Sequence, residues 1–224
     1  MNLRPPGLMN RPAPAAGATV GANDCLAEVE DTRHRYFDRA LGMTVVNVFQ
    51  GDYYITSRRD EVLTTVLGSC IAACIRDPVI GYGGMNHFLL PQMGGDVTGP
   101  MSASLRYGSF AMEQLINEIL RRGGRRERLE VKVFGGGNVM AGLSGVGHKN
   151  ADFIEEFLRN EGLAIAGMHL RGNRARKVQY MPGSGKVRMR EVGTSAAQKL
   201  ATKEVAQNVK VIVAEDTGAI ELFD

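Results

Sequence analysis

A cysteine and a histidine stand at a spacing that can bring them together as a nucleophile and its base. The segment from Cys70 to His87 reads CIAACIRDPVIGYGGMNH, and the DPVIG stretch in its middle favours a turn. We therefore predict a β-hairpin. If its turn is centred between Pro78 and Val79, Cys70 directly faces His87, and such opposed residues have Cβ atoms about 4.5 to 5.5 Å apart.

A histidine beside a thiol permits chemistry that a thiol alone performs poorly. An unperturbed cysteine has a pKa of about 8.5, so at neutral pH most of it is protonated. A histidine within hydrogen-bond reach takes the proton and leaves a nucleophilic thiolate. Backbone N–H groups near Ser69 and Cys70 are candidates for holding the oxyanion of such a reaction.

The same residues also have a plain structural interpretation. Cysteine is among the most buried residue types, and Cys74 in the same predicted strand is interpreted as a core residue. One bulged residue in the hairpin would move His87 to the opposite face from Cys70. The predicted pair of Cys70 and His87 therefore depends on the register of the hairpin.

The elements expected around the hairpin define an α+β fold, a layered β-rich sandwich with two main helices. Apolar spacing predicts a helix from Leu105 to about Ile119, ended by two glycines, and a second helix through 153–158. A short helix is expected within the charged residues 26–40. The stretch 64–77 is apolar and interrupted by Gly68. Strand patterns cover 43–49, 129–134, 163–169, 177–181 and 186–192. Weaker patterns near the C-terminus predict a helix over 194–207 and a strand over 209–215.

Length and composition favour one folded domain with extensions. The chain has 224 residues, of which 44% are hydrophobic and 23% charged, so one substantial core is expected. Residues 1–25 contain half of the eight prolines and are interpreted as a disordered tail, while 196–224 form a C-terminal extension of uncertain role. No apolar run approaches about 18 residues, so we expect no membrane insertion. The three cysteines do not suggest a secreted disulfide framework, which favours the cytoplasm.

The charged residues point to neither a nucleic acid nor a metal. The net charge is +3, and two basic clusters, at 121–126 and 171–177, are interpreted as solvated faces in preference to the alternative, contact with an acidic partner or a nucleic-acid backbone. The four histidines are scattered without cysteine or carboxylate residues at ligand spacing, so no metal and no cofactor are predicted. GSGK at 183–186 lacks the remaining residues of a phosphate loop and is interpreted as a hairpin turn.

Five short motifs resemble one known family. They are LGSC (67–70), RDP (76–78), GGMNHFLLP (83–91), FGGGNVM (134–140) and GNRAR (172–176). In the same order they are similar to motifs of the CheD family, the chemoreceptor glutamine deamidases. The resemblance covers roughly residues 43–195, which are expected to form a CheD-like domain.

This resemblance implies an activity and a third site residue. The implied reaction is hydrolysis of selected glutamine side chains in the cytoplasmic helical region of methyl-accepting chemotaxis receptors, with Cys70 attacking the amide and His87 transferring the protons through a thioester. The family has a catalytic threonine six residues before the cysteine, where this chain has Thr64, and its implied role is to orient His87. An unbroken strand would place Thr64 about 20 Å from Cys70, so a chain reversal at Gly68 or Ser69 is required.

Two other functions remain open. Basic surfaces such as GNRAR could serve a non-catalytic adaptor that binds receptors or a CheC-type phosphatase, although this motif is also explained as a turn with solvated arginines. A thiol enzyme of the transglutaminase kind would share the cysteine and histidine but transfer the acyl group to amines. Retention of Cys70, His87 and Thr64 together favours catalysis over binding alone.

Overall fold

The computed structural model describes residues 35–90, 100–139 and 145–193, with side chains from Arg106 onward in the first helix. The predicted tail over 1–25, the extension over 196–224, and the helix and strand expected at 194–207 and 209–215 lie outside the described residues. Within the described ranges, neither helix combines the length and the apolar character needed to cross a membrane.

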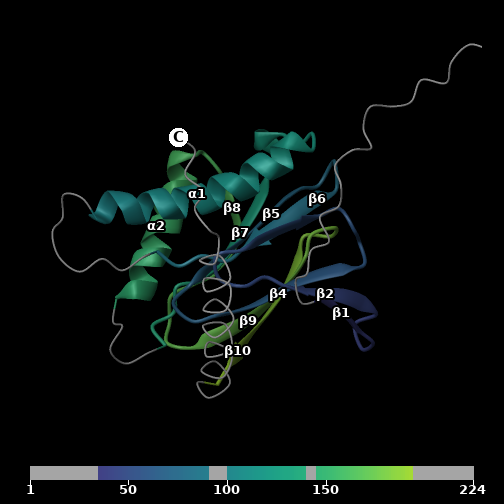
Figure 1. The fold of residues 1–224 in the computed structure, drawn as a ribbon, viewed down its shortest axis with the longest axis horizontal. Helices are drawn as coiled ribbons and strands as arrows, with labels where there is room; N and C mark the ends of the chain where they lie inside the picture. The colour runs from purple at the N-terminus through teal and green to yellow at the C-terminus, as the bar shows by residue number, and fades with distance from the viewer. Residues whose placement is uncertain (1–34, 91–99, 140–144, 194–224) are drawn as a thin grey trace, which may run out of the picture. The chain divides into compact units, whose positions relative to one another are not determined.

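Within the described ranges, ten strands form two five-stranded sheets, whose arrangement is drawn in Figure 1. The first sheet has the order β1-β2-β4-β9-β10 and the second has the order β3-β6-β5-β7-β8. Pairs β2/β4 and β7/β8 are parallel, and the others are antiparallel. The strands are β1 (Arg35–Asp38), β2 (Met43–Asn47), β3 (Tyr53–Thr56), β4 (Glu61–Leu67), β5 (Ile71–Asp77), β6 (Tyr82–Asn86), β7 (Glu130–Gly135), β8 (Ile165–Leu170), β9 (Ala175–Met181) and β10 (Lys186–Val192).

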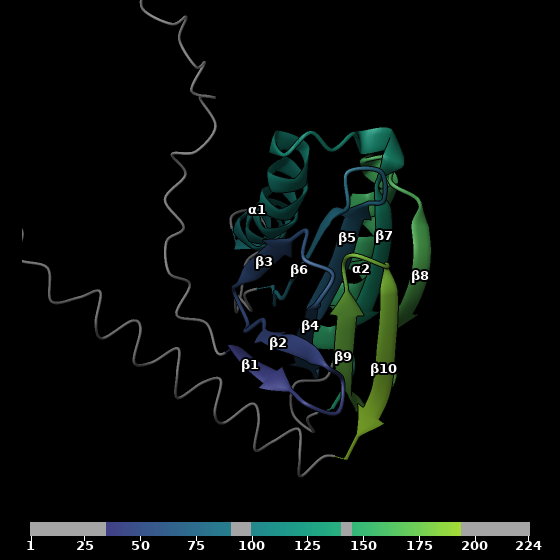
Figure 2. The same cartoon turned by 90° about the vertical axis from the view of Figure 1, so that its right-hand side faces the viewer.

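The described part of the chain is layered, with the second sheet between the first sheet and two helices. Helices α1 (Pro100–Arg121) and α2 (Val146–Asn160) follow β6 and β7, and a 3-10 turn, η1 (Arg126–Arg128), lies between α1 and β7. One apolar cluster joins the helices to the second sheet, and another fills the space between the sheets. Figure 2 shows α1 beside β3 and β6. The predicted layered α+β sandwich with two main helices is confirmed.

Each layer is filled by one face of each strand, as the alternation of side chains requires. On β4, Leu63 and Leu67 pack into the layer between the sheets. On β5, Ala72 and Cys74 face that same layer, whereas Ile71, Ala73 and Ile75 pack under the helices. The sequence of β5 is a continuous apolar run because both faces of this strand are covered.

The structure departs from the sequence-based elements at two places. The helix expected within 26–40 is wrong for Arg35–Asp38, which form β1 and pair antiparallel with β2. The apolar stretch 64–77 is two strands, β4 in the first sheet and β5 in the second, separated at Gly68–Cys70. The chain therefore passes from one sheet to the other directly before Cys70.

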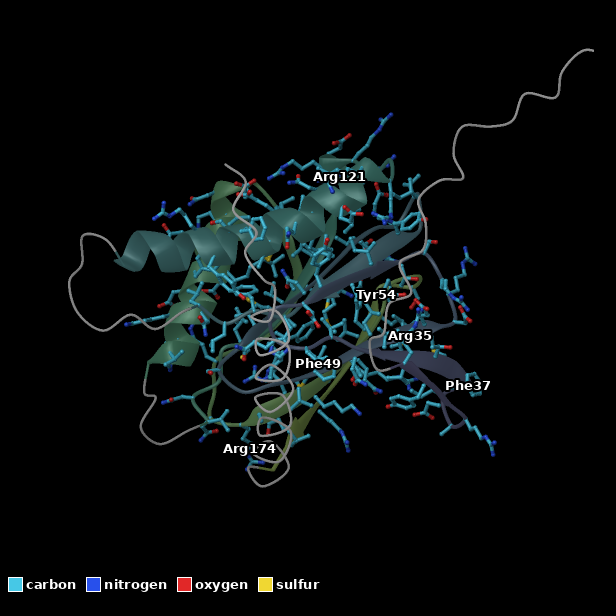
Figure 3. The ribbon with its side chains drawn as sticks, viewed as in Figure 1. Arg35, Phe37, Phe49, Tyr54, Arg121 and Arg174 are labelled. Atoms are coloured by element: carbon cyan, nitrogen blue, oxygen red, sulfur yellow. The ribbon has the colours of Figure 1, made fainter. Side chains whose placement is uncertain are left out.

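A buried carboxylate links the edges of the two sheets. Glu61 of β4 is only 1% exposed and forms an ion pair with Arg35 of β1. The Tyr54 hydroxyl of β3 donates to Glu61 Oε2 at 3.1 Å, and Arg35 Nη2 donates to the Tyr54 oxygen at 2.9 Å (Figure 3). A buried charge needs such partners because burial removes its hydration.

Candidate active site

The loop before Cys70 is held by backbone hydrogen bonds from the glycine-rich segment after β7. Gly136 N–H donates to Cys70 O and Gly137 N–H donates to Gly68 O, both at 2.8 Å. Gly135 has φ +118°, and a Cβ there would lie 2.0 Å from Cys70 O. Only glycine fits this position without displacing the loop, because other residues rarely adopt that φ and would collide with the carbonyl.

The carbonyl of Ser69, between those of Gly68 and Cys70, is held by a side chain of helix α2. Asn150 of α2 is fully buried, and its Nδ2 donates to Ser69 O at 2.8 Å. Its Oδ1 accepts from Leu90 N–H at 3.1 Å, so one side chain joins the loop to the segment after His87. Ser69, predicted as a tentative oxyanion residue, is thus fixed in position beside Cys70, but its catalytic role stays a prediction.

His87 is buried, and its two ring nitrogens have different surroundings. Its Nδ1 lies 2.8 Å from Thr65 Oγ1 and 3.3 Å from Val48 O. A carbonyl oxygen only accepts, so this contact favours the tautomer with the proton on Nδ1. Within the described residues Nε2 has no hydrogen-bond partner although it is buried. In this tautomer Nε2 carries a lone pair that is available to accept a proton.

The threonine hydroxyl that contacts His87 belongs to Thr65. Successive side chains of a strand point to opposite faces. Thr65 shares the face of Leu63 and Leu67, which pack between the sheets. The Thr64 hydroxyl donates instead to Val178 O of β9 at 3.0 Å. The structure does not bring Thr64 together with His87, and the expected orienting contact is made one residue further along β4.

The predicted direct opposition of Cys70 and His87 is wrong by two residues. In the structure Cys74 pairs with Met85 and Asp77 pairs with Tyr82. The Asp77 carboxylate accepts from Val79 and Ile80 N–H groups, and Gly81 adopts φ +74°, so the turn is centred later than expected.

The corrected register still leaves the two residues on one face. An isolated bridge between Ile71 and Phe88 continues the same register, which puts His87 opposite Ala72. Cys70, two residues before Ala72, is then a diagonal neighbour of His87. A shift of two preserves the face because the side-chain period of a strand is two, and diagonal neighbours remain within reach of long side chains.

The two described cysteines have different surroundings. Cys70 is half-buried, packs against the cluster between the sheets, and its Sγ donates to Gln50 Oε1 at 3.4 Å. Cys74 is buried in that cluster, and burial raises the pKa of its thiol. Neither is in a disulfide. The interpretation of Cys74 as a core residue is confirmed.

Three residues of this site were not predicted from the sequence: Val48, Gln50 and Thr65. Val48 and Gln50 lie in the connection between β2 and β3, far from the hairpin along the chain, and nothing in their types indicated a contact. Thr65 had a usable signal, because it alternates with Leu63 and Leu67 on the buried face of the strand.

Burial of His87 gives a testable pH dependence of stability. Desolvation lowers the pKa of His87 from 6.5 to about 4. Between these values the unfolded chain binds a proton that the folded protein does not, so stability falls as the pH falls from 6.5 toward 4. In denaturant titrations the wild type is expected to lose about 3 kcal/mol more of unfolding free energy over this interval than His87→Gln. Equal losses in the two proteins would contradict the buried neutral imidazole.

The GNRAR segment (172–176) has one buried arginine and one exposed arginine. Arg176 is 1% exposed, and its guanidinium donates to His169 O and Arg171 O. A backbone hydrogen bond connects this segment to the glycine-rich loop after β7, because Asn138 N–H donates to Gly172 O at 2.7 Å. The expectation of solvated arginines is wrong for Arg176 and right for Arg174, whose side chain is 70% exposed (Figure 3).

Most other members of the two basic clusters pair with carboxylates. Arg121 and Arg122 of α1 form ion pairs with Glu118, and Arg171 pairs with Asp152 and Glu155 of α2. Such pairs at the surface add little stability, but they reduce the positive field that a polyanion would meet. In the described ranges, no three histidine, cysteine or carboxylate side chains gather as metal ligands.

The fold and site define a class of protein: a two-sheet α+β domain that places a thiol and a buried imidazole on one face between its sheets. A family model described as CheD chemotactic sensory transduction matches residues 89–191. A Rhodopseudomonas palustris protein named probable chemoreceptor glutamine deamidase CheD is 47% identical over 215 residues, covering 96% of this chain and 100% of its own length. The chain belongs to the CheD family.

A second curated relative and one solved structure give further comparisons. A protein of the same name from Bordetella parapertussis is 45% identical over 189 residues, covering 83% of this chain and 88% of its own length. Among solved structures, the hypothetical protein YfiH of Bacillus licheniformis has a TM-score of 0.33 and 13% identity, over 55% of this chain and 50% of that one.

Proposed function

We propose that this protein deamidates glutamine side chains of methyl-accepting chemotaxis receptors, with Cys70 as nucleophile and His87 as its base. The observation that carries the mechanism is the buried imidazole, whose Nδ1 is occupied by Val48 O and Thr65 Oγ1 while Nε2 has no partner among the described residues. A buried unsatisfied nitrogen costs about 1 to 3 kcal/mol, so its retention is better explained by a role in proton transfer.

The chemistry follows from these positions. Nε2 accepts the Cys70 proton, and the thiolate attacks the amide carbon of a receptor glutamine to give a tetrahedral oxyanion. The imidazolium then gives its proton to the departing ammonia, which leaves a thioester. Water that loses a proton to His87 hydrolyses the thioester and releases glutamate, which restores the enzyme. Backbone N–H groups at Ser69 and Cys70 are candidates for holding the oxyanion.

Incubation with the purified cytoplasmic helical fragment of a receptor tests this function. Mass spectrometry of the fragment is expected to show amide-to-acid conversion at specific glutamines, with release of ammonia in equal amount. Tight binding of the fragment without any conversion would favour the non-catalytic adaptor. The target region of the receptors is cytoplasmic, so the proposal places this protein in the cytoplasm.

Two variations of the assay separate the other candidates. Adding a primary amine distinguishes hydrolysis from acyl transfer, because a transglutaminase-like enzyme would form an amine adduct in place of glutamate. A CheC-type phosphatase is the second partner that the family resemblance implies. Its binding to this protein is measured by calorimetry with the two purified proteins, and an effect on the deamidation rate would give that contact a regulatory meaning.

Paired threonine variants show which hydroxyl orients His87. Thr65→Val is expected to lower kcat about tenfold, since one lost hydrogen bond of about 1.4 kcal/mol corresponds to that factor. Thr64→Val is expected to cost about 1 kcal/mol of unfolding free energy through its lost bond to Val178 O, with little effect on kcat. The reverse result, in which only Thr64→Val slows the reaction, would support the orienting role that the family resemblance implies for Thr64.

A further inference from the structure

The connection between β2 and β3 is fastened to His87 on both sides of Gln50. Gly51 N–H donates to His87 O at 2.7 Å, and His87 N–H donates to Asp52 O at 2.9 Å. On the other side, Val48 O contacts the imidazole of the same residue. Gly51 has φ +91°, a conformation that favours glycine and turns the chain back toward β3. The backbone of Gln50 is therefore positioned by the proposed base itself, in the loop marked by Phe49 in Figure 3.

The side chain of Gln50 reaches the proposed nucleophile. Cys70 Sγ donates to Gln50 Oε1 at 3.4 Å, and Gln50 is half-buried. A carboxamide has an acceptor oxygen on one side and two N–H donors on the other, and a half-turn of its terminal torsion exchanges them. While the thiol keeps its proton, the oxygen faces the sulfur. After that proton has moved to His87, the sulfur only accepts, and the donor side becomes the favourable one.

From this contact we propose that Gln50 is a further catalytic residue, whose carboxamide N–H donates to the oxyanion formed when Cys70 attacks a substrate glutamine. This inference rests on the deamidase function proposed above. In the attack, the sulfur lone pair forms the S–C bond, and the C=O π pair moves onto the amide oxygen. That oxygen lies two bonds from Sγ, so a carboxamide already touching Sγ is within hydrogen-bond reach of it.

A neutral donor suits this position better than a charged group. The site is largely buried, and a preoriented neutral dipole stabilises a developing negative charge without the cost of burying a permanent one. When the tetrahedral intermediate collapses, the pair returns to the carbonyl and ammonia leaves with the proton from His87. The Gln50 contact then weakens, so its contribution is largest in the transition state, where it raises kcat.

The test compares kcat and KM of three variants on the receptor fragment. Gln50→Met keeps the length of the side chain without N–H donors and is expected to lower kcat about 100-fold while KM changes by less than about threefold. Gln50→Glu also has no N–H donor and adds a negative charge, so a loss at least as large is expected. Gln114→Met, the same substitution in α1, serves as the matched control and is expected to retain wild-type kinetics.

A second measurement separates an oxyanion donor from a merely structural residue. Alkylation of Cys70 by iodoacetamide proceeds without an oxyanion, so Gln50→Met is expected to slow alkylation by far less than it lowers kcat and to keep the wild-type melting temperature. Alkylation that slows in parallel with kcat, or kcat retained within about twofold, would overturn the inference. Conversion of Gln50 itself to glutamate in the wild type would also overturn it, by making Gln50 a substrate. Failure of the proposed function is seen separately, as wild type that converts no receptor glutamine.

Discussion

Cys70→Ala is expected to lower the rate of receptor glutamine deamidation by about 10⁴-fold or more, because the other described thiol, Cys74, is buried and cannot reach a substrate. The measurement is amide-to-acid conversion of the receptor fragment by mass spectrometry under conditions that saturate the wild type. Conversion that persists in Cys70→Ala at more than a small fraction of the wild-type rate would refute the thiol mechanism.

Cys74→Ala provides the matched control for this experiment. Cys74 lies on the same face of the hairpin but is buried between the sheets, where desolvation raises the pKa of its thiol and suppresses the thiolate. The variant is expected to keep its catalytic rate and to lose about 1 kcal/mol of unfolding free energy through the deleted sulfur. Alkylation followed by peptide mapping should label Cys70 and leave Cys74 unmodified in the folded protein.

His87→Gln is expected to lower the deamidation rate by about 10³-fold, because the variant has no group that both takes the thiol proton and returns it to ammonia. Its residual rate should rise with pH, since hydroxide must then remove the proton. The wild type depends on pH in another way. The imidazole is a base only when neutral, and its pKa is lowered to about 4, so activity should persist below pH 6.5 and decline as the pH falls through about 4.

The alkylation rate of Cys70 gives an independent check on His87. If His87 activates the thiol, His87→Gln should slow alkylation at neutral pH as well as deamidation. Normal alkylation together with lost deamidation would instead restrict His87 to the later proton transfer to ammonia. Wild-type deamidation in His87→Gln would contradict its assignment as the base.

Much of the fold follows from local patterns in the sequence. Alternating residues such as those of LEVKVF mark β7, and apolar residues at helical spacing mark α1 and α2. The strand β1 was missed because its residues, RYFD, show no apolar alternation and three of the four are exposed. Such an edge strand is formed through its pairing with β2 and not through a buried face of its own.

The site was predictable only in part, for reasons of geometry. Cys70 and His87 lie on the same face of the hairpin in spite of a two-residue error in the predicted register, because side-chain direction along a strand repeats every two residues. The turn itself was misplaced because Gly81 closes it in a positive-φ conformation, which residue types alone did not locate. Gln50 reaches Cys70 only through the loop fastened to His87, and a contact between such distant segments leaves no periodic pattern in the sequence.

The crossing between sheets at Gly68–Cys70 bears on when the protein becomes reactive during synthesis. All the side chains proposed for catalysis lie between residues 50 and 87, and these leave the ribosome before β7 and β9 do. One of the two neighbours of β4, namely β9, and one of the two neighbours of β5, namely β7, come from the later half of the chain, as do the glycines that hold the loop before Cys70. A nascent chain therefore carries every reacting group before it has the frame that aligns them, and activity waits for completion of the domain.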